Sequence, residues 1–318
     1  MTTMKSLRFE KYGPPSVLSV QDLPVPVPGP GEALIELHAS AINPSDVKNV
    51  AGTFKASLPR VPGRDYAGVV VAGEGWTGKN VWGSGAQFGV SRDGAHAQYV
   101  LADTDGLSEK PSGLSMEEAA TVGVPYLAAW SALVHAAEIR PGETALITGA
   151  LGAVGRAAIQ IAHWKNAKVI GADIADGATE ADVFVNTKRS DLAAEAKSFT
   201  DGKGVDVALD AVGGPMFEPS LRSLRQVGRQ VAITSIGNGR VEFSLVDFYH
   251  NLLRLIGVDT LKLTGPQIAA IMDDLRPGFE NGHLRPSPVQ TWPLAQGVDA
   301  YAAVAKGTAS SKQVLLLR

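Results

Sequence analysis

The feature of this sequence that most constrains its fold is a glycine-rich turn between an apolar run and a helical run. The segment ALITGALGAVGRAAIQIA (145–162) carries Gly149, Gly152 and Gly155 at intervals of three, a variant of the G-x-G-x-x-G fingerprint in which Ala150 takes the first position. A glycine at position 152 lets a pyrophosphate approach the backbone, and one at 155 lets the helix pack close to the strand. The segment therefore predicts a strand–turn–helix unit that binds a dinucleotide at the helix N-terminus. The alternative is a glycine turn that serves packing alone.

The remainder of the chain divides into a β-rich part and a part in which strands and helices alternate. Before Pro111, short β-branched or alternating runs are separated by glycine and proline, as at 33–42, 67–73 and 95–102. After it, apolar runs alternate with helical stretches, which predicts an α/β fold with a doubly wound parallel sheet. The expected strands of this sheet are 144–149, 167–173, 182–186, 205–213, 229–237 and 253–259, and the expected helices include 155–166, 191–200 and 215–226.

Local signals place several further segments. Ser115 and Glu118 have the spacing of a capping box, so a helix should begin near Ser115. A second helix is expected at 126–139, and the tail should form helices at 265–277 and near 294–306 before a last strand at 313–318. Alternating prolines in LPVPVPGPG (23–31) predict an extended connector, with a proline-rich ligand for a partner as the alternative.

Composition excludes several classes of function. A length of 318 residues suits two domains, and a net charge of -3 argues against a nucleic-acid or anionic-lipid partner. The chain has no cysteine, which excludes a disulfide framework, a thiolate nucleophile and cysteine-ligated zinc. It also lacks a G-x-S-x-G motif, a signal peptide and a long uninterrupted apolar stretch, so we expect a cytoplasmic protein that is not a serine hydrolase.

Eight segments spread over nearly the whole chain follow the pattern of one known family. They are AINPSDV (41–47), VPGRDYAGVV (61–70), GAHAQYV (94–100), LSMEEAATVGVPYLAAWSAL (114–133), PGETALITGALGAVG (141–155), VDVALDAVGG (205–214), LRQVGRQVAI (224–233) and SSKQVLLLR (310–318). Together they resemble the medium-chain dehydrogenase/reductase superfamily, in its zinc-free quinone oxidoreductase branch. The resemblance implies a GroES-like β domain at 1–118 and 263–318, a Rossmann domain at 119–262, and an active site formed by both. It also implies a homodimer through the edges of the Rossmann sheets, for which 253–259 is the candidate edge.

Zinc is not expected. The zinc-dependent branch surrounds its metal with a cysteine, a His-Glu pair and a further cysteine or aspartate. In this sequence the first of those positions is Asn43, and the His-Glu pair is replaced by Arg64-Asp65. The histidines also lack the H-x-x-x-H spacing of a metal-binding helix.

The resemblance also points to the catalytic residues. It places Asn43 and Asp46 of the N-P-x-D stretch beside the nicotinamide, although the same residues could simply form a turn with Asx hydrogen bonding. Two tyrosines found in relatives are absent, since their positions hold Lys48 and Phe54. Lys48 is a candidate proton donor, with a solvated surface lysine as the alternative. An enoyl-thioester reductase needs a proton at carbon, so this absence favours a quinone, whose oxygen water can protonate.

The cofactor is expected to be NAD(P)H. By resemblance the branch favours NADPH, but Asp173 lies at the expected place of a carboxylate that binds an adenosine ribose, which favours NADH. A solvated strand-end residue is the alternative for Asp173. The segment 174–180 is too short for a normal crossover helix and should be a loop or a single turn. The predicted cofactor-binding residues are Asn43, Ala150, Gly152, Ala153, Val154, Gly155, Asp173, Lys188, Val212 and Ser235.

These observations favour a zinc-independent reductase that transfers a hydride from NAD(P)H to a small molecule, a quinone or another activated carbonyl or alkene. The alternative is a family member that binds the nucleotide but has a structural or regulatory role, which the missing tyrosines would also suit.

Overall fold

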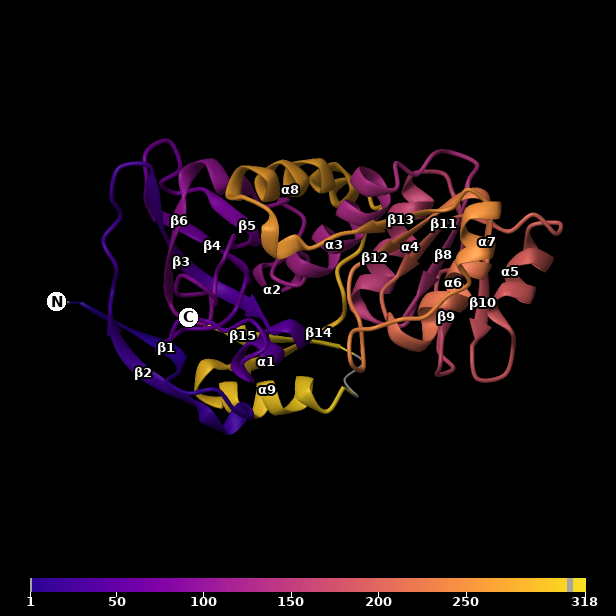
Figure 1. Cartoon of the computed structure of the whole chain (residues 1–318). Coiled ribbons are helices and arrows are strands. Elements are labelled where there is room, and N and C mark those ends of the chain that lie inside the picture. The colour runs from indigo at the N-terminus through magenta and orange to yellow at the C-terminus, as the bar shows by residue number, and fades with distance from the viewer. Residues whose placement is uncertain (1, 308–310) are drawn as a thin grey trace. The chain divides into compact units, whose positions relative to one another are not determined.

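The computed structural model describes residues 2–307 and 311–318, shown in Figure 1. These residues divide into two compact units. The first comprises the described residues of Met1–Val124, Leu261–Asn281 and Pro286–Arg318, and the second comprises Pro125–Thr260 and Gly282–Arg285. Within the described residues, no helix has the length and apolar character that crossing a membrane requires.

A mostly antiparallel sheet forms the body of the first unit. Its strands run in the order β14-β15-β3-β4-β5-β7, with β6 paired to β3, while β1 and β2 form a separate antiparallel pair. A strand near the C-terminus, β15, therefore lies beside β3 from the N-terminal part. The bounds are β1 (Thr3–Phe9), β2 (Leu18–Pro24), β3 (Glu32–Ala41), β4 (Asp65–Ala72), β5 (Asn80–Ser84), β6 (Tyr99–Asp103), β7 (Ser108–Glu109), β14 (Val289–Pro293) and β15 (Lys312–Leu316).

Helices cover this sheet and close its core. The helix α8 packs against β5 and β7, and α9 packs against β15 and β2. The core beside α9 contains fully buried side chains from distant parts of the chain, such as Leu7, Ile35 and Tyr301. Burial of this apolar surface is the main stabilising contribution. The helices are α1 (Pro44–Val50), α2 (Met116–Ala119), α8 (Gly265–Glu280) and α9 (Gly297–Ala305).

The second unit is a parallel sheet covered by helices, as the alternating sequence pattern predicts. Its strands run in the order β10-β9-β8-β11-β12-β13. The strands β9 and β10 are added on one side of β8 and the strands β11 to β13 on the other, so the strand order reverses between β8 and β11. Such a switch point is where open α/β sheets bind their ligands. The elements are α3 (Gly123–Trp130), β8 (Thr144–Thr148), α4 (Ala153–Trp164), β9 (Lys168–Asp173), β10 (Val183–Asn186), α5 (Leu192–Phe199), β11 (Val205–Asp210), α6 (Phe217–Arg222), β12 (Leu224–Ala232), α7 (Leu245–His250) and β13 (Arg254–Gly257).

Several boundaries differ from the sequence-based expectations. The helix expected at 126–139 becomes a π-helix over Ser131–Ala136. The strand expected at 229–237 begins at Leu224 and ends at Ala232, because an irregularity in its pairing with β11 accommodates Val227 at φ 57°. The strand expected at 95–102 begins only at Tyr99, because the preceding residues hydrogen-bond to β1 instead.

The first unit ends at Val124, whose N–H donates to the Asp65 carboxylate at 2.9 Å. A Cβ at Gly123 would lie 2.2 Å from the same carboxylate oxygen. The start of α3 is thereby held against β4.

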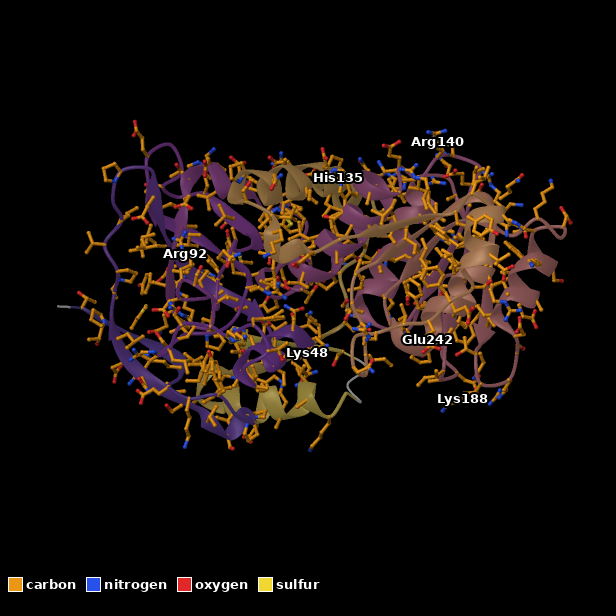
Figure 2. All side chains as sticks on the ribbon, in the orientation of Figure 1. Lys48, Arg92, His135, Arg140, Lys188 and Glu242 are labelled. Atoms are coloured by element: carbon orange, nitrogen blue, oxygen red, sulfur yellow. The ribbon has the colours of Figure 1, made fainter. Side chains whose placement is uncertain are left out.

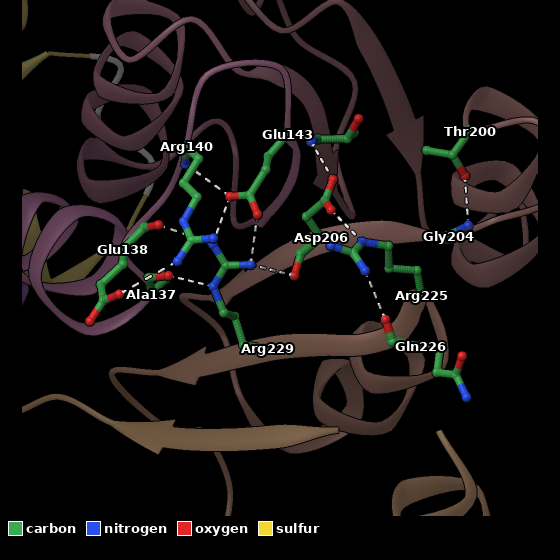
Figure 3. A network of polar contacts seen from close by, with 11 residues as sticks. Ala137, Glu138, Arg140, Glu143, Thr200, Gly204, Asp206, Arg225, Gln226 and Arg229 are labelled. Atoms are coloured by element: carbon green, nitrogen blue, oxygen red, sulfur yellow. Dashed lines mark hydrogen bonds and ion pairs between the residues drawn. The ribbon is translucent and has the colours of Figure 1, made fainter. Parts of the chain in front are cut away.

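A buried arginine joins the π-helix to the sheet of the second unit (Figure 3). The Arg229 guanidinium donates to both oxygens of Glu143, at 2.6 and 3.0 Å, and to the carbonyls of Ala137 and Glu138. It also reaches the Asp206 carbonyl of β11 at 3.3 Å. Because Arg229 is only 8% exposed, these partners compensate the cost of burying its charge.

Candidate active site

The predicted phosphate-binding turn connects β8 to α4. The strand ends at Thr148, Gly149 adopts φ +63°, and Gly152 is the N-cap of α4. The Ala150 N–H donates to the Ala172 carbonyl at 3.1 Å, which ties the turn to β9. The first N–H groups of α4 and its dipole therefore face the carboxyl end of the sheet, where an anion is favoured.

The glycines of this turn fulfil different requirements. A Cβ at Gly155 would lie 2.2 Å from the Gly149 carbonyl oxygen, so only glycine allows the helix to approach the strand. A Cβ at Gly152 would meet only that oxygen, at 3.2 Å, and Gly152 is otherwise exposed. The backbone in front of α4 is thus open to a ligand, as a pyrophosphate requires, and the residues present fit a dinucleotide. Ala153 and Val154, both half-buried, form the first turn of α4.

Asp173 ends β9 beside this turn. Its carboxylate accepts hydrogen bonds from the Leu151 N–H at 3.1 Å and the Ile174 N–H at 2.7 Å. An ionised carboxylate has about four acceptor sites, so further hydrogen bonds to ribose hydroxyls remain available. The segment 174–180 after it contains no helix, so the prediction of a loop crossover is confirmed.

A pair of side chains that sequence reasoning missed fixes the loop after β11. The Thr148 hydroxyl donates to Asp210 at 2.8 Å and accepts from the Ala211 N–H, while the same Asp210 oxygen accepts from the N–H groups of Val212 and Gly213. The predicted residue Val212 is thereby held against Gly149 of the phosphate turn. The aspartate at the strand end in VDVALDAVGG was the signal that could have revealed this pair.

Ser235 lies on the other side of the same loop. A Cβ at Gly213 would come within 2.7 Å of the Ser235 Cα, so this glycine allows the two segments to approach. The structure thus brings Ser235, Val212 and the phosphate turn together at the carboxyl ends of β12, β11 and β8. Lys188 follows β10, the edge strand that pairs with β9, and is exposed (Figure 2).

In the first unit, Asn43 and Asp46 form a buried polar cluster at the start of α1. The two residues make a capping box, in which the Asp46 carboxylate accepts the Asn43 N–H at 2.7 Å. This bond closes the N-terminus of α1. Arg64 makes an ion pair with Asp46 at 3.7 Å and hydrogen-bonds to Ser45. Lys48 lies on the exposed side of the same helix (Figure 2).

The side chain of Asn43 is held at both ends. Its Nδ2 donates to Asp65 at 2.8 Å, and its Oδ1 accepts from the ammonium group of Lys312, a residue that sequence reasoning missed. Lys312 is only 7% exposed, and a lysine is almost never so buried unless partners compensate its charge. Burial lowers the pKa of Lys312 and raises the pKa of Asp65, while the attraction between these two charges opposes both shifts.

The residues at the family's metal-ligand positions thus bond to one another. The Asn43 amide donates directly to the Asp65 carboxylate. The Asn43 Oδ1 accepts a hydrogen bond from the ammonium group of Lys312, which can only donate. Among residues 2–307 and 311–318, no group of three or more His, Cys, Asp or Glu side chains is placed to hold a metal ion.

Comparison with known proteins agrees with this geometry. The model of the alcohol dehydrogenase GroES-like domain matches residues 29–112, and that of the zinc-binding dehydrogenase family matches residues 153–273. Human quinone oxidoreductase is 30% identical over 327 residues, covering 99% of this chain and 98% of its own. The chain belongs to the medium-chain dehydrogenase/reductase superfamily, in its zinc-free quinone oxidoreductase branch.

Other members of the superfamily are similarly close. A zinc-type alcohol dehydrogenase-like protein of Schizosaccharomyces pombe is 36% identical, covering 88% of this chain and 86% of its own. A solved NAD-dependent alcohol dehydrogenase superposes with a TM-score of 0.88 at 29% identity, covering 99% of this chain and 100% of its own. The predicted fold class is confirmed, and the protein is an NAD(P)H-dependent oxidoreductase.

Proposed function

We propose that this oxidoreductase transfers a hydride from NAD(P)H to a quinone or another activated carbonyl or alkene of small size. The observation that carries the proposal is the open backbone at Gly152, in front of the N-terminus of α4 and beside Asp173. The names of the quinone oxidoreductase relatives support the choice of acceptor. The hydride chemistry is supplied by the nicotinamide, and the protein orients the two reactants.

Within this proposal the second unit binds the dinucleotide. Gly152, Ala153 and Val154 take the pyrophosphate on the helix N-terminus, with Ala150 and Gly155 shaping the turn. Asp173 accepts hydrogen bonds from the adenosine ribose, and Lys188 lies next to the ribose site. Val212 and Ser235 line the part of the site that binds the nicotinamide. The Thr148–Asp210 pair gives Val212 its position without contacting the ligand itself.

The first unit supplies the residues for the reaction. We assign Asn43 to contact with the nicotinamide or the acceptor, since its amide orientation is set by Lys312 and Asp65. Asp46 holds the Asn43 backbone. Lys48 is exposed and can carry a proton to the reduced acceptor, a role that water can also fill for a quinone oxygen.

Steady-state oxidation of NADH and NADPH with a panel of quinones, enals and enones tests the function. We expect turnover with at least one quinone, unchanged by a chelator, and no stoichiometric zinc in elemental analysis of the purified protein. Lys48→Met should lower kcat less than tenfold if water shares its role. Cofactor binding without turnover on any acceptor would favour the non-catalytic alternative, which the residues Lys48 and Phe54 at the tyrosine positions also suit.

We further propose a homodimer through the β13 edge of the second unit. In the described part of the chain, β13 ends the sheet, and large apolar side chains near it are exposed. They are Leu245 (64%), Tyr249 (53%), Leu252 (60%) and Leu255 (38%). An unpaired edge strand flanked by apolar surface is suited to pairing with a second copy.

Sedimentation of the Leu255→Lys variant tests this interface. We expect the parent to sediment as a dimer and Leu255→Lys to shift to a monomer, because a charge on the pairing strand repels its symmetry mate. Val20→Lys is the matched control, since Val20 is 39% exposed on a strand of the first unit and should leave the dimer intact. A monomeric parent would exclude the proposal.

A further inference from the structure

We propose that Asp176 makes this enzyme selective for NADH by holding Arg189 in an ion pair, away from the 2′-phosphate that distinguishes NADPH. The inference rests on the proposed binding of NAD(P)H by the second unit. It adds that NADH is the preferred cofactor and that Asp176 is the residue that determines this preference.

The ends of β9 and β10 lie side by side. Asp173 pairs with Asn186 in the parallel register, and the Thr187 N–H donates to the Asp173 carbonyl at 2.9 Å. The loop after β9 and the turn after β10 therefore share one edge of the site. A cation that serves a 2′-phosphate next to Asp173 can come from one of these two segments or from Arg156 of α4, which donates to the carbonyls of Leu151 and Ala178 at 3.0 and 3.3 Å.

Asp176, in the loop after β9, engages the arginine of the neighbouring turn. Arg189 donates to both carboxylate oxygens of Asp176, at 2.7 and 3.3 Å, which is the bidentate geometry that guanidinium groups form with carboxylates and phosphates. Asn186 donates to the same carboxylate at 2.8 Å. This hydrogen bond and the charge of Arg189 lower the pKa of Asp176, so the carboxylate stays ionised at neutral pH.

The charges at this edge therefore suit a ribose hydroxyl rather than a phosphate. Asp173 and Asp176 contribute two negative charges. Of the nearby cations, Arg189 is bonded to Asp176 and Arg156 donates to the carbonyls of Leu151 and Ala178, which leaves the single charge of Lys188 to face both carboxylates. A phosphate monoester adds close to two negative charges at neutral pH, which one lysine does not balance. A neutral ribose needs only acceptors, and Asp173 provides them.

The ion pair of Asp176 and Arg189 can be removed without destabilising the fold. The side chains of Arg189 and Asp176 are 70% and 60% exposed, and exposed ion pairs contribute little to stability. A substitution at Asp176 thus changes the charge and frees Arg189 while the strands on either side keep their hydrogen bonds.

Titration of the full-length protein with NADH and NADPH, followed by calorimetry or cofactor fluorescence, tests the inference. We expect the parent to bind NADH at least tenfold more tightly. Asp176→Asn should tighten NADPH binding about tenfold, the order expected for removing one charge near a dianion, and leave NADH binding unchanged. Asp176→Asn combined with Arg189→Gln should lose this gain. The matched control is Asp201→Asn, an exposed turn residue at φ +52° that asparagine tolerates, and it should change neither affinity.

The outcomes separate the inference from the function on which it rests. A parent that binds NADPH as tightly as NADH, an Asp176→Asn variant with unchanged NADPH affinity, or a gain that persists without Arg189 would overturn the inference while the nucleotide site stands. A parent that binds neither nucleotide would overturn the proposed function and the inference with it.

Discussion

Replacing Gly152 with valine should abolish nucleotide binding and leave the protein folded. The backbone of Gly152 has φ -76° and ψ 168°, which any residue adopts, and its Cβ would approach only the Gly149 carbonyl oxygen, at 3.2 Å. The branched side chain would nevertheless occupy the space in front of α4 that the pyrophosphate needs. We expect the Kd for NADH and NADPH to rise at least a hundredfold in a calorimetric titration, with the circular dichroism spectrum unchanged.

Two further glycine variants make this result specific. Gly113→Val, at an exposed position with nothing near its Cβ, should leave both binding and stability as in the parent. Gly155→Val should instead destabilise the second unit, because its Cβ would lie 2.2 Å from a backbone oxygen. If Gly152→Val binds either nucleotide with the parent's affinity, the pyrophosphate lies elsewhere.

Replacing Lys312 with methionine should destabilise the first unit by about 3 kcal/mol, because the buried Asp65 carboxylate loses the stronger of its two attractions to cations and keeps only that of Arg64. The Oδ1 of Asn43 would lose its donor at the same time. Denaturant unfolding of the full-length protein, followed by tryptophan fluorescence, measures the change, since the first unit contributes Trp76, Trp82 and Trp292 to the signal and the second unit Trp130 and Trp164.

A charge-neutral double variant separates electrostatics from packing. In Lys312→Met combined with Asp65→Asn, the new amide can still accept from Val124 and can donate to Asn43 after rotation of the Asn43 amide, so most of the lost stability should return. Lys79→Met, which removes an exposed lysine paired with Glu109, should change stability by less than about 0.5 kcal/mol. Equal unfolding midpoints for Lys312→Met and the parent would show that this ammonium does not compensate Asp65.

The parts of the fold that the sequence predicted are those with local causes. The strand–turn–helix unit follows from three glycines, the capping box at Ser115 from a spacing of three, and the loop at 174–180 from the number of residues available. Each of these signals lies within about one turn or strand of the structure that it predicts.

The missed contacts join residues that lie far apart along the chain. Lys312 meets Asn43 only because β15 pairs with β3, and Thr148 meets Asp210 only because β8 and β11 are neighbours at the switch point. Strand order and register decide such contacts, and no periodicity in a single segment reports them. The ion pair of Asp176 and Arg189 was also not predicted, although the two residues are only 13 positions apart on either side of β10.

The position of β15 between β14 and β3 has a consequence for how the protein is made. A ribosome synthesises the chain from its N-terminus, and Val205–Asp210 or Arg254–Gly257 leave it well before Lys312–Leu316. All strands of the second unit have therefore been made while the first unit still lacks β15, a strand from the interior of its sheet. It also still lacks Lys312, the cation that compensates Asp65. Until β15 has been made, the part of β3 that pairs with it, Ala39–Ala41, is an unpaired edge, the kind of surface that can pair with other chains.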